Sequence, residues 1–258
     1  MANLRPCLLL ILTAAALSGC SSSASFSAAA GIWEPKVDCF LNKEDNTGRL
    51  DVRDAGISGE TKAMFIVEGS MTKSSGKEGA QRYNVGFWSL SRSGSTDLGA
   101  GTLGFDGKTF TGDVHSHLEA TDYIFTGEAP GTTQNQQAAG GIFGIHLLNV
   151  DYTIEDDLGT DARFYKWVPM PVIGVRYEAN VGQSMSAYLL TEFMNLAIFN
   201  IKSFDAEFLH VDAGVKIALG NNMSIKGGYK TWSFKVGMNE DYVKLDGDGA
   251  TVLLEIAF

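Results

Sequence analysis

From residue 33 onward, hydrophobic and polar residues alternate one by one along much of the chain. Residues 172–180 place Ile173 and Val175 on one face and Arg176 on the other. This period of two predicts a strand, because successive side chains of a strand point to opposite faces. Nine further segments are predicted as strands by the same alternation or by their apolar content, at 34–42, 62–71, 81–92, 110–126, 140–154, 184–198, 205–219, 223–236 and 248–258.

The connections between these segments fall into two kinds. Residues 180–183 and 219–222 are tight turns with residues that tolerate positive φ, whereas 43–61, 93–109 and 155–168 are longer and polar or acidic. With an even number of strands and an N-terminus in the periplasm, both tight turns fall on the periplasmic side and the three long loops fall outside. Short turns on one side and long loops on the other are typical of an all-β, antiparallel, up-and-down transmembrane β-barrel. We predict about ten strands, with eight as the alternative.

Composition excludes two classes of protein. The 258 residues include 20 basic and 30 acidic side chains, for a formal net charge of −10, so a nucleic-acid partner is not expected. No series of apolar runs of about 20 residues is present, which excludes a polytopic helical membrane protein. A barrel remains compatible with the near-zero mean hydropathy, because its two faces average out. We expect no cofactor.

The N-terminal residues have the pattern of an export signal. A positive charge at Arg5 precedes an apolar run, and Leu17-Ser-Gly-Cys20 resembles a bacterial lipobox. We therefore predict a signal peptide at 1–19, lipidation at Cys20, a flexible tether at 20–32 and a barrel domain at 33–258. Cleavage after Ala30 by ordinary signal peptidase is the alternative. Either cut leaves Cys39 without a disulfide partner in the mature chain.

The C-terminal strand resembles that of Gram-negative outer-membrane β-barrel proteins. The chain ends on Phe258, with Ile256, Leu254 and Val252 at alternate positions before it. The family usually has an aromatic residue where Ile256 stands, so the match is partial. Residues 227–230 and 171–174 also resemble turn-to-strand entries of small outer-membrane barrels. The resemblance implies a location in the outer membrane, contact with its lipids, and assembly by the barrel-assembly machinery.

Several roles are compatible with such a barrel. We expect a structural, interaction or narrow-pore function, and a specific protein partner is unknown from the sequence. The alternatives are a lipid-modifying enzyme in the same barrel and a soluble periplasmic β lipoprotein that binds a ligand. Aromatic residues towards strand ends fit the interfacial belts of a membrane barrel; these are Trp88, Tyr123, Tyr152, Trp167, Tyr188 and Trp232.

The densest group of chemically active side chains is Asp113-Val-His-Ser-His-Leu-Glu119. On a strand, His115, His117 and Glu119 share one face, and this set is a weak candidate for a zinc or related divalent site. The other interpretation is a polar wall without an ion. His146 and His210 are interpreted as single polar lining residues.

An enzymatic role is left open but not favoured, and no catalytic residue is assigned. Some outer-membrane barrels modify lipid A with a histidine, a serine and a carboxylate. Here His115 and Ser116 are adjacent and therefore point to opposite faces, so the two cannot form a nucleophile–base pair.

Overall fold

The computed structural model describes residues 24–42, 50–59, 63–74, 80–129, 132–134, 137–195, 204–238 and 241–258. Within these ranges no helix is long and apolar enough to cross a membrane. The strands are β1 (Ala24–Asn42), β2 (Leu50–Asp51), β3 (Met64–Ser74), β4 (Ala80–Asp97), β5 (Leu103–Phe105), β6 (Lys108–Phe110), β7 (Asp113–Glu128), β8 (Thr132–Gln134), β9 (Gln137–Asp156), β10 (Asp161–Asn180), β11 (Met185–Asn195), β12 (Phe204–Ala218), β13 (Met223–Met238) and β14 (Asp241–Ala257).

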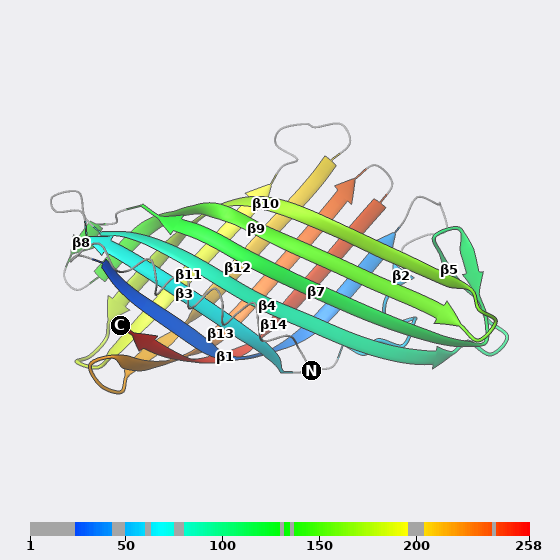
Figure 1. Cartoon of the computed structure of the whole chain (residues 1–258), viewed down its shortest axis with the longest axis horizontal. Coiled ribbons are helices and arrows are strands. Elements are labelled where there is room, and N and C mark those ends of the chain that lie inside the picture. Colours follow the sequence, from blue (N-terminus) through cyan, green and yellow to red (C-terminus); the bar gives the residue numbers. More distant parts are fainter. Residues whose placement is uncertain are drawn as a thin grey trace.

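Ten long strands form a closed antiparallel barrel (Figure 1). Its order follows the chain as β1, β3, β4, β7, β9, β10, β11, β12, β13 and β14, and β14 pairs back onto β1. The closing pair runs from Ser27 opposite Ala257 to Asn42 opposite Tyr242. Closure leaves no open edge of unpaired backbone groups, which is the condition for a sheet to exist in lipid. The predicted count of ten is confirmed, and each predicted segment overlaps one long strand in the predicted order.

Several predicted boundaries are wrong. β1 begins at Ala24, so the part of the expected tether from residue 24 to 32 is strand, paired with both β3 and β14. Residues 93–97 and 161–168, both expected in long loops, belong to β4 and β10, and residues 241–247 belong to β14. In residues 24–32 and 161–168 the hydrophobic contrast between the two faces is weak, but neighbouring strands provide backbone partners. In residues 241–247 the contrast is present, because Val243 and Leu245 are buried and alternate with polar residues. The signal peptide and Cys20 lie outside the described residues.

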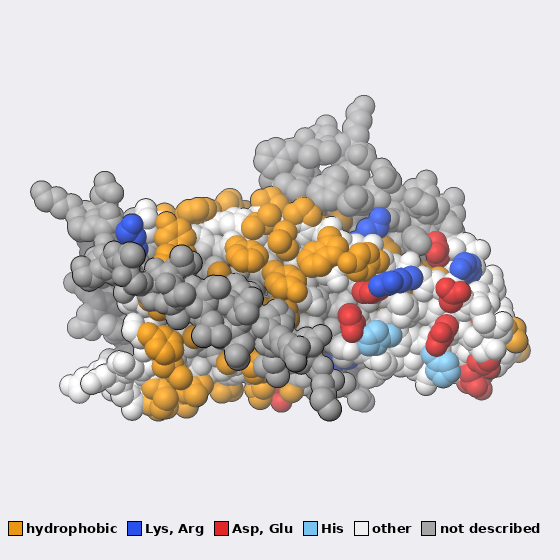
Figure 2. Space-filling view, viewed as in Figure 1, with side chains coloured by type: hydrophobic (Ala, Val, Ile, Leu, Met, Phe, Trp, Pro, Cys, Tyr) orange, Lys and Arg blue, Asp and Glu red, His pale blue; other side chains and the backbone are white. Residues whose placement is uncertain are grey.

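In the half of the barrel that holds the C-terminus, the apolar faces of the strands point outward. In β14, Val252, Leu254 and Ile256 are exposed by 39% or more, whereas Leu253 is fully buried inside. We call the end of the barrel where the C-terminal strand ends the terminal end. Figure 2 shows apolar side chains over the central part of the visible face and over the terminal end, and charged and histidine side chains towards the opposite end. A soluble β-barrel would turn its apolar face inward. We therefore assign the outward apolar side chains to a lipid-facing belt, which argues against the soluble lipoprotein alternative.

The barrel extends well beyond this belt at one end. The tight turns 181–184 and 219–222 lie at the same end as the C-terminal strand end, as predicted. β9 and β10 each have 20 residues, roughly 65 Å of strand, while a membrane crossing needs only about ten. The outer ends of β4, β7, β9 and β10 therefore form a projecting wall above the belt.

The inside of the projection is filled by an apolar core. Two segments between the long strands fold onto it, residues 50–59 and the hairpin of β5 and β6, with Phe105 and Phe110 almost completely buried. At Gly94 of β4 the backbone of Gly56 approaches so closely that a Cβ atom would lie 2.1 Å from the Gly56 oxygen. Ser116, which points inward from β7, donates a 2.7 Å hydrogen bond to the carbonyl of Ala55. The segment is thus held against the inner wall.

Candidate functional site

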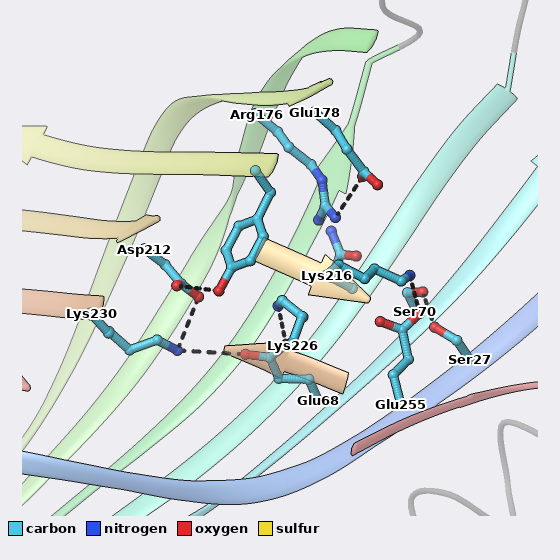
Figure 3. A network of polar contacts seen from close by, with 12 residues as sticks. Ser27, Glu68, Ser70, Arg176, Glu178, Asp212, Lys216, Lys226, Lys230 and Glu255 are labelled. Atoms are coloured by element: carbon cyan, nitrogen blue, oxygen red, sulfur yellow. Dashed lines mark hydrogen bonds and ion pairs between the residues drawn. The ribbon is translucent and has the colours of Figure 1, made fainter. Parts of the chain in front are cut away.

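The half of the lumen that lies within the belt is lined by ion pairs (Figure 3). Glu68 on β3 accepts hydrogen bonds from Lys226 at 3.1 Å and Lys230 at 3.5 Å, both on β13. Lys230 also lies 3.7 Å from Asp212 on β12, and the hydroxyl of Tyr188 on β11 donates to Asp212 at 3.1 Å. These five side chains come from four strands around the wall. They join opposite sides of the barrel through its interior.

A second set of ion pairs lies closer to the terminal end. Glu128 accepts from Asn84 at 2.9 Å and lies 3.4 Å from Arg176, which also contacts Glu178 at 3.4 Å. Further pairs in this layer join Lys216 to Glu255 at 2.8 Å and Arg82 to Glu128 at 3.9 Å. A cavity of about 90 Å³ remains between the two sets of charges. Charged side chains therefore line this part of the lumen and are paired across it.

Above the charged layer, four buried side chains form a histidine chain, which we define as Asp122, His146, Glu192 and His210. Nδ1 of His146 lies 2.8 Å from Oδ2 of Asp122, and its Nε2 lies 3.4 Å from Oε2 of Glu192. Oε2 of Glu192 lies 2.7 Å from Nδ1 of His210. All four side chains are at most 5% exposed. Interpreting the two histidines as separate lining residues was therefore wrong.

One contact of the histidine chain could have been predicted from the sequence. Glu192 and His210 are directly opposed on β11 and β12, which are joined by a single connection. His146 and Asp122 lie on β9 and β7 and are diagonal rather than opposed. Linking the two pairs requires contact across the intervening strand β10, which no pairing of neighbouring strands could indicate.

Tryptophan side chains close the lumen above the histidine chain. Trp88 packs edge-on against Trp33 and Trp232, with ring centroids 5.8 Å and 5.0 Å apart. Trp232 also stacks on Phe234, which is fully buried. The expected interfacial belt was therefore wrong for Trp88, Trp232, Tyr152 and Tyr188, which point inward. The prediction that the side chains face outward is correct for Tyr123 and Trp167, whose rings stack on the outer face with centroids 6.1 Å apart.

The predicted metal ligands lie on the outer face of the projecting wall. His115, His117 and Glu119 share that face of β7, as expected, and Nε2 of His117 lies 3.2 Å from Oε1 of Glu119. Nδ1 of His117 is occupied by Ser93 of β4, at 2.7 Å. In the described part of the chain, no group of three or more His, Cys, Asp or Glu side chains is placed to hold a metal ion. The geometry therefore gives the divalent-ion prediction no support.

Other polar and thiol groups also have structural environments that explain them. Asp246 accepts a 2.6 Å hydrogen bond from Ser233, and Asp248 accepts one from Tyr229, both within the β13–β14 ladder. Cys39 is a free thiol buried in the apolar core of the projection. Burial raises the pKa of this thiol, so it is not a reactive nucleophile.

The solved structures most useful for comparison are outer-membrane barrels. The chain is similar to the outer membrane protease OmpT from Escherichia coli, with a TM-score of 0.56 and 10% identity over 92% of this chain and 97% of that one. The translocator domain of the autotransporter NalP from Neisseria meningitidis aligns with a TM-score of 0.43 and 8% identity over 98% and 95% of the two chains. No family model and no curated protein matches.

At this level of identity the likeness to OmpT concerns the fold alone. The closed ten-stranded antiparallel barrel and its outward apolar belt agree with that fold. The chain thus has the closed antiparallel β-barrel fold of outer-membrane proteins, with an apolar outer belt suited to a lipid bilayer.

Proposed function

We propose that this protein is a non-conducting outer-membrane barrel that acts through its projecting wall, in a structural or interaction role. The observation that carries the proposal is the filling of the lumen in successive layers: charged side chains at the terminal end, the histidine chain, and the tryptophan and apolar core. A pore needs a continuous aqueous path. The cavity of about 90 Å³ has room for only a few water molecules, and the apolar core lies beyond it.

Charge pairing in the lumen supports this interpretation. The inward-facing carboxylates of the belt are Glu68, Asp122, Glu128, Glu178, Glu192, Asp212 and Glu255, and the lysines and arginines are Arg82, Arg176, Lys216, Lys226 and Lys230. The carboxylates exceed the lysines and arginines by two, and His146 and His210 contact two of these carboxylates, Asp122 and Glu192. Most of these groups already have a charged partner in the wall. Charges that are paired with one another across the lumen are not available to attract permeating ions, so they cross-link the wall rather than line a conducting path.

Conductance across a planar lipid bilayer tests the proposal. We expect no stepwise current from the refolded protein, under conditions in which a general porin reconstituted in the same way conducts. Lys230→Ala serves as a matched variant, because it removes a side chain from the charged layer and leaves the apolar core closed. It should also be silent. Reproducible current steps from the wild-type barrel, abolished by prior boiling, would contradict the proposal.

We propose lipid attachment at Cys20 as a second anchor. Only three residues separate Cys20 from the first residue of β1, a span of at most about 14 Å. Cleavage after Ala30 would remove the part of β1 that pairs with both β3 and β14, which argues for the earlier cut. Labelling with radioactive palmitate should be lost in Cys20→Ala and kept in Cys39→Ala.

The C-terminal strand is the proposed contact for the barrel-assembly machinery. Phe258 is 73% exposed, and its backbone N–H donates to the carbonyl of Phe26 at 2.8 Å. Its side chain is therefore free for recognition while its backbone closes the barrel. Phe258→Ala should reduce the folded fraction in cells and leave refolding of the purified chain in detergent unchanged. An equal loss in both settings would assign Phe258 to barrel stability instead.

A further inference from the structure

A serine, a histidine and a carboxylate are joined on the outer face of the projecting wall. Ser93 of β4 is directly opposite His117 of β7, and both side chains point outward. Oγ of Ser93 lies 2.7 Å from Nδ1 of His117, and Nε2 of the same ring lies 3.2 Å from Oε1 of Glu119. The side chains of His117 and Glu119 are 39% and 55% exposed. A water-borne or membrane-borne molecule can reach all three.

The two contacts fit the roles of nucleophile, base and orienting group. A hydrogen bond from Nε2–H to Glu119 leaves the lone pair of Nδ1 facing the Ser93 hydroxyl, which can then lose its proton to the ring. The roles of the two ring nitrogens are exchanged relative to the chymotrypsin arrangement, but a triad is defined by geometry and roles. We propose that Ser93, His117 and Glu119 form a serine-esterase site for acyl esters in the head-group layer of the outer leaflet.

The height of the site above the belt indicates this class of substrate. Outward-facing aromatic rings mark the outer part of the belt: Phe87, Tyr123 and Trp167 contact one another in sequence, and Tyr165 lies two residues further out on β10. Ser93 lies six residues beyond Phe87 on the same face of β4, about 20 Å along the strand and about 15 Å in height for a usual strand tilt. The site is therefore above the acyl chains, at the level of glycan or phosphate head groups, so the esters within reach are O-acyl groups carried by the head groups rather than the linkages that hold the membrane acyl chains.

The neighbouring pair on the same face provides a contrast. Ser95 and His115 are also directly opposed, one step further from the membrane. Among the described residues, no hydrogen bond joins this second pair, and no carboxylate contacts His115. Direct opposition of a serine and a histidine on these two strands is therefore not enough to produce a hydrogen-bonded serine, histidine and carboxylate. Ser95 and His115 are controls with the same residue types, the same strands and similar exposure.

The reaction balances with water as the second substrate. Oγ of Ser93 attacks the ester carbonyl while its proton passes to Nδ1 of His117, and the same proton then leaves with the alcohol as the C–O bond breaks. Water, deprotonated by His117, hydrolyses the acyl-serine to the free acid and restores the serine. Backbone N–H groups in the β4–β7 ladder are engaged between strands and are not free to form an oxyanion hole. We therefore expect slow turnover.

Labelling with a fluorophosphonate probe and hydrolysis of a p-nitrophenyl acyl ester test the site in the refolded full-length barrel. The wild-type protein should be labelled at Ser93, and Ser93→Ala should lose the label and at least about 100-fold of the esterase rate, as expected for loss of a nucleophile. Ser95→Ala and His115→Ala should keep both. Absence of labelling in the wild-type protein, or equal labelling of Ser93→Ala, would overturn the proposal.

Glu119 is the positioning residue, and its test separates positioning from folding. Glu119→Gln should lower kcat about tenfold with KM unchanged, and Glu119→Asp should recover part of the rate. Both variants should keep the shift between unheated and boiled samples that reports a folded barrel. A barrel that hydrolyses the ester only after Glu119 substitution, or at a rate independent of it, would contradict this role. The outcome is independent of the conductance test, because the outer wall and the lumen share no residue in these two experiments.

Discussion

Oδ2 of Asp122 and Nδ1 of His146 lie 2.8 Å apart in the middle of the barrel, and both side chains are at most 1% exposed. Removing one member leaves the other buried without its partner. We expect His146→Ala to lower the free energy of unfolding by about 3 to 5 kcal/mol, the usual result of breaking a buried charged pair. Urea unfolding in detergent, followed by tryptophan fluorescence, measures it. His115→Ala, on the outer wall, should change it by less than about 0.5 kcal/mol; similar losses in both would contradict the role of burial.

Gly94 controls the docking of residues 50–59 inside the projection. A Cβ atom there would lie 2.1 Å from the backbone oxygen of Gly56, and Gly56 itself has a φ of 86°. We expect Gly94→Ala to cost about 1 to 3 kcal/mol, because backbone must move to admit a methyl group. Limited proteolysis should then cut within 50–59 faster than in the wild-type chain. Gly99→Ala is a control for an added methyl group, with no atom within 4 Å of its Cβ but a positive φ of its own.

The Asp156 carboxylate stabilises the turn at the outer tip of β9 in a pH-dependent way. Burial alone would raise the pKa of this carboxyl, but hydrogen bonds from the backbone of Thr160, Thr111 and Leu158 lower it below its ordinary value. A lowered pKa in the folded state stabilises the tip at pH values above the unfolded pKa of about 3.9, and this contribution disappears as pH falls through the folded value.

Hydrogen exchange of the Leu158 and Thr160 amides measures this effect. Protection in the wild-type protein should exceed that in Asp156→Asn near neutral pH, since the amide has one acceptor oxygen fewer. The difference should shrink as the solution is acidified below about pH 4. A difference that grows on acidification would show the opposite sign of linkage.

The orientation of the barrel can be tested with single cysteines at its two ends. Leu158 is 81% exposed at the tip of the projecting wall, and Asn222 is exposed in a tight turn at the opposite end. In intact cells, a membrane-impermeant maleimide should label Leu158→Cys and leave Asn222→Cys unlabelled. Permeabilised cells should give labelling of both. The buried thiol of Cys39 should contribute no signal in either case. Labelling of Asn222→Cys alone would reverse the assigned orientation.

The alternation of side chains was sufficient to predict the fold. In strands such as β12 and β14 one face is continuously apolar and the other is polar or small. The strand period and the face that points outward can therefore both be predicted from the sequence. The tight turns at 180–183 and 219–222 then fixed which strand ends lie together. Where alternation lost its contrast, the prediction failed: in β10, Pro169 and Pro171 argued against a strand and the outer residues mix Arg163 with Tyr165.

Local sequence determined which face of each strand meets lipid, because that property depends only on alternate residues. The tertiary structure decided which inward side chains meet one another. Asp122, His146, Glu192 and His210 come from four strands, and Ser93 reaches His117 only through the β4–β7 register. These contacts depend on strand stagger and on closure of the barrel, which are set by hydrogen bonds between distant segments. No periodicity within one segment encodes that stagger, so neither the complete histidine chain nor the contact between Ser93 and His117 could be predicted before the strands were placed.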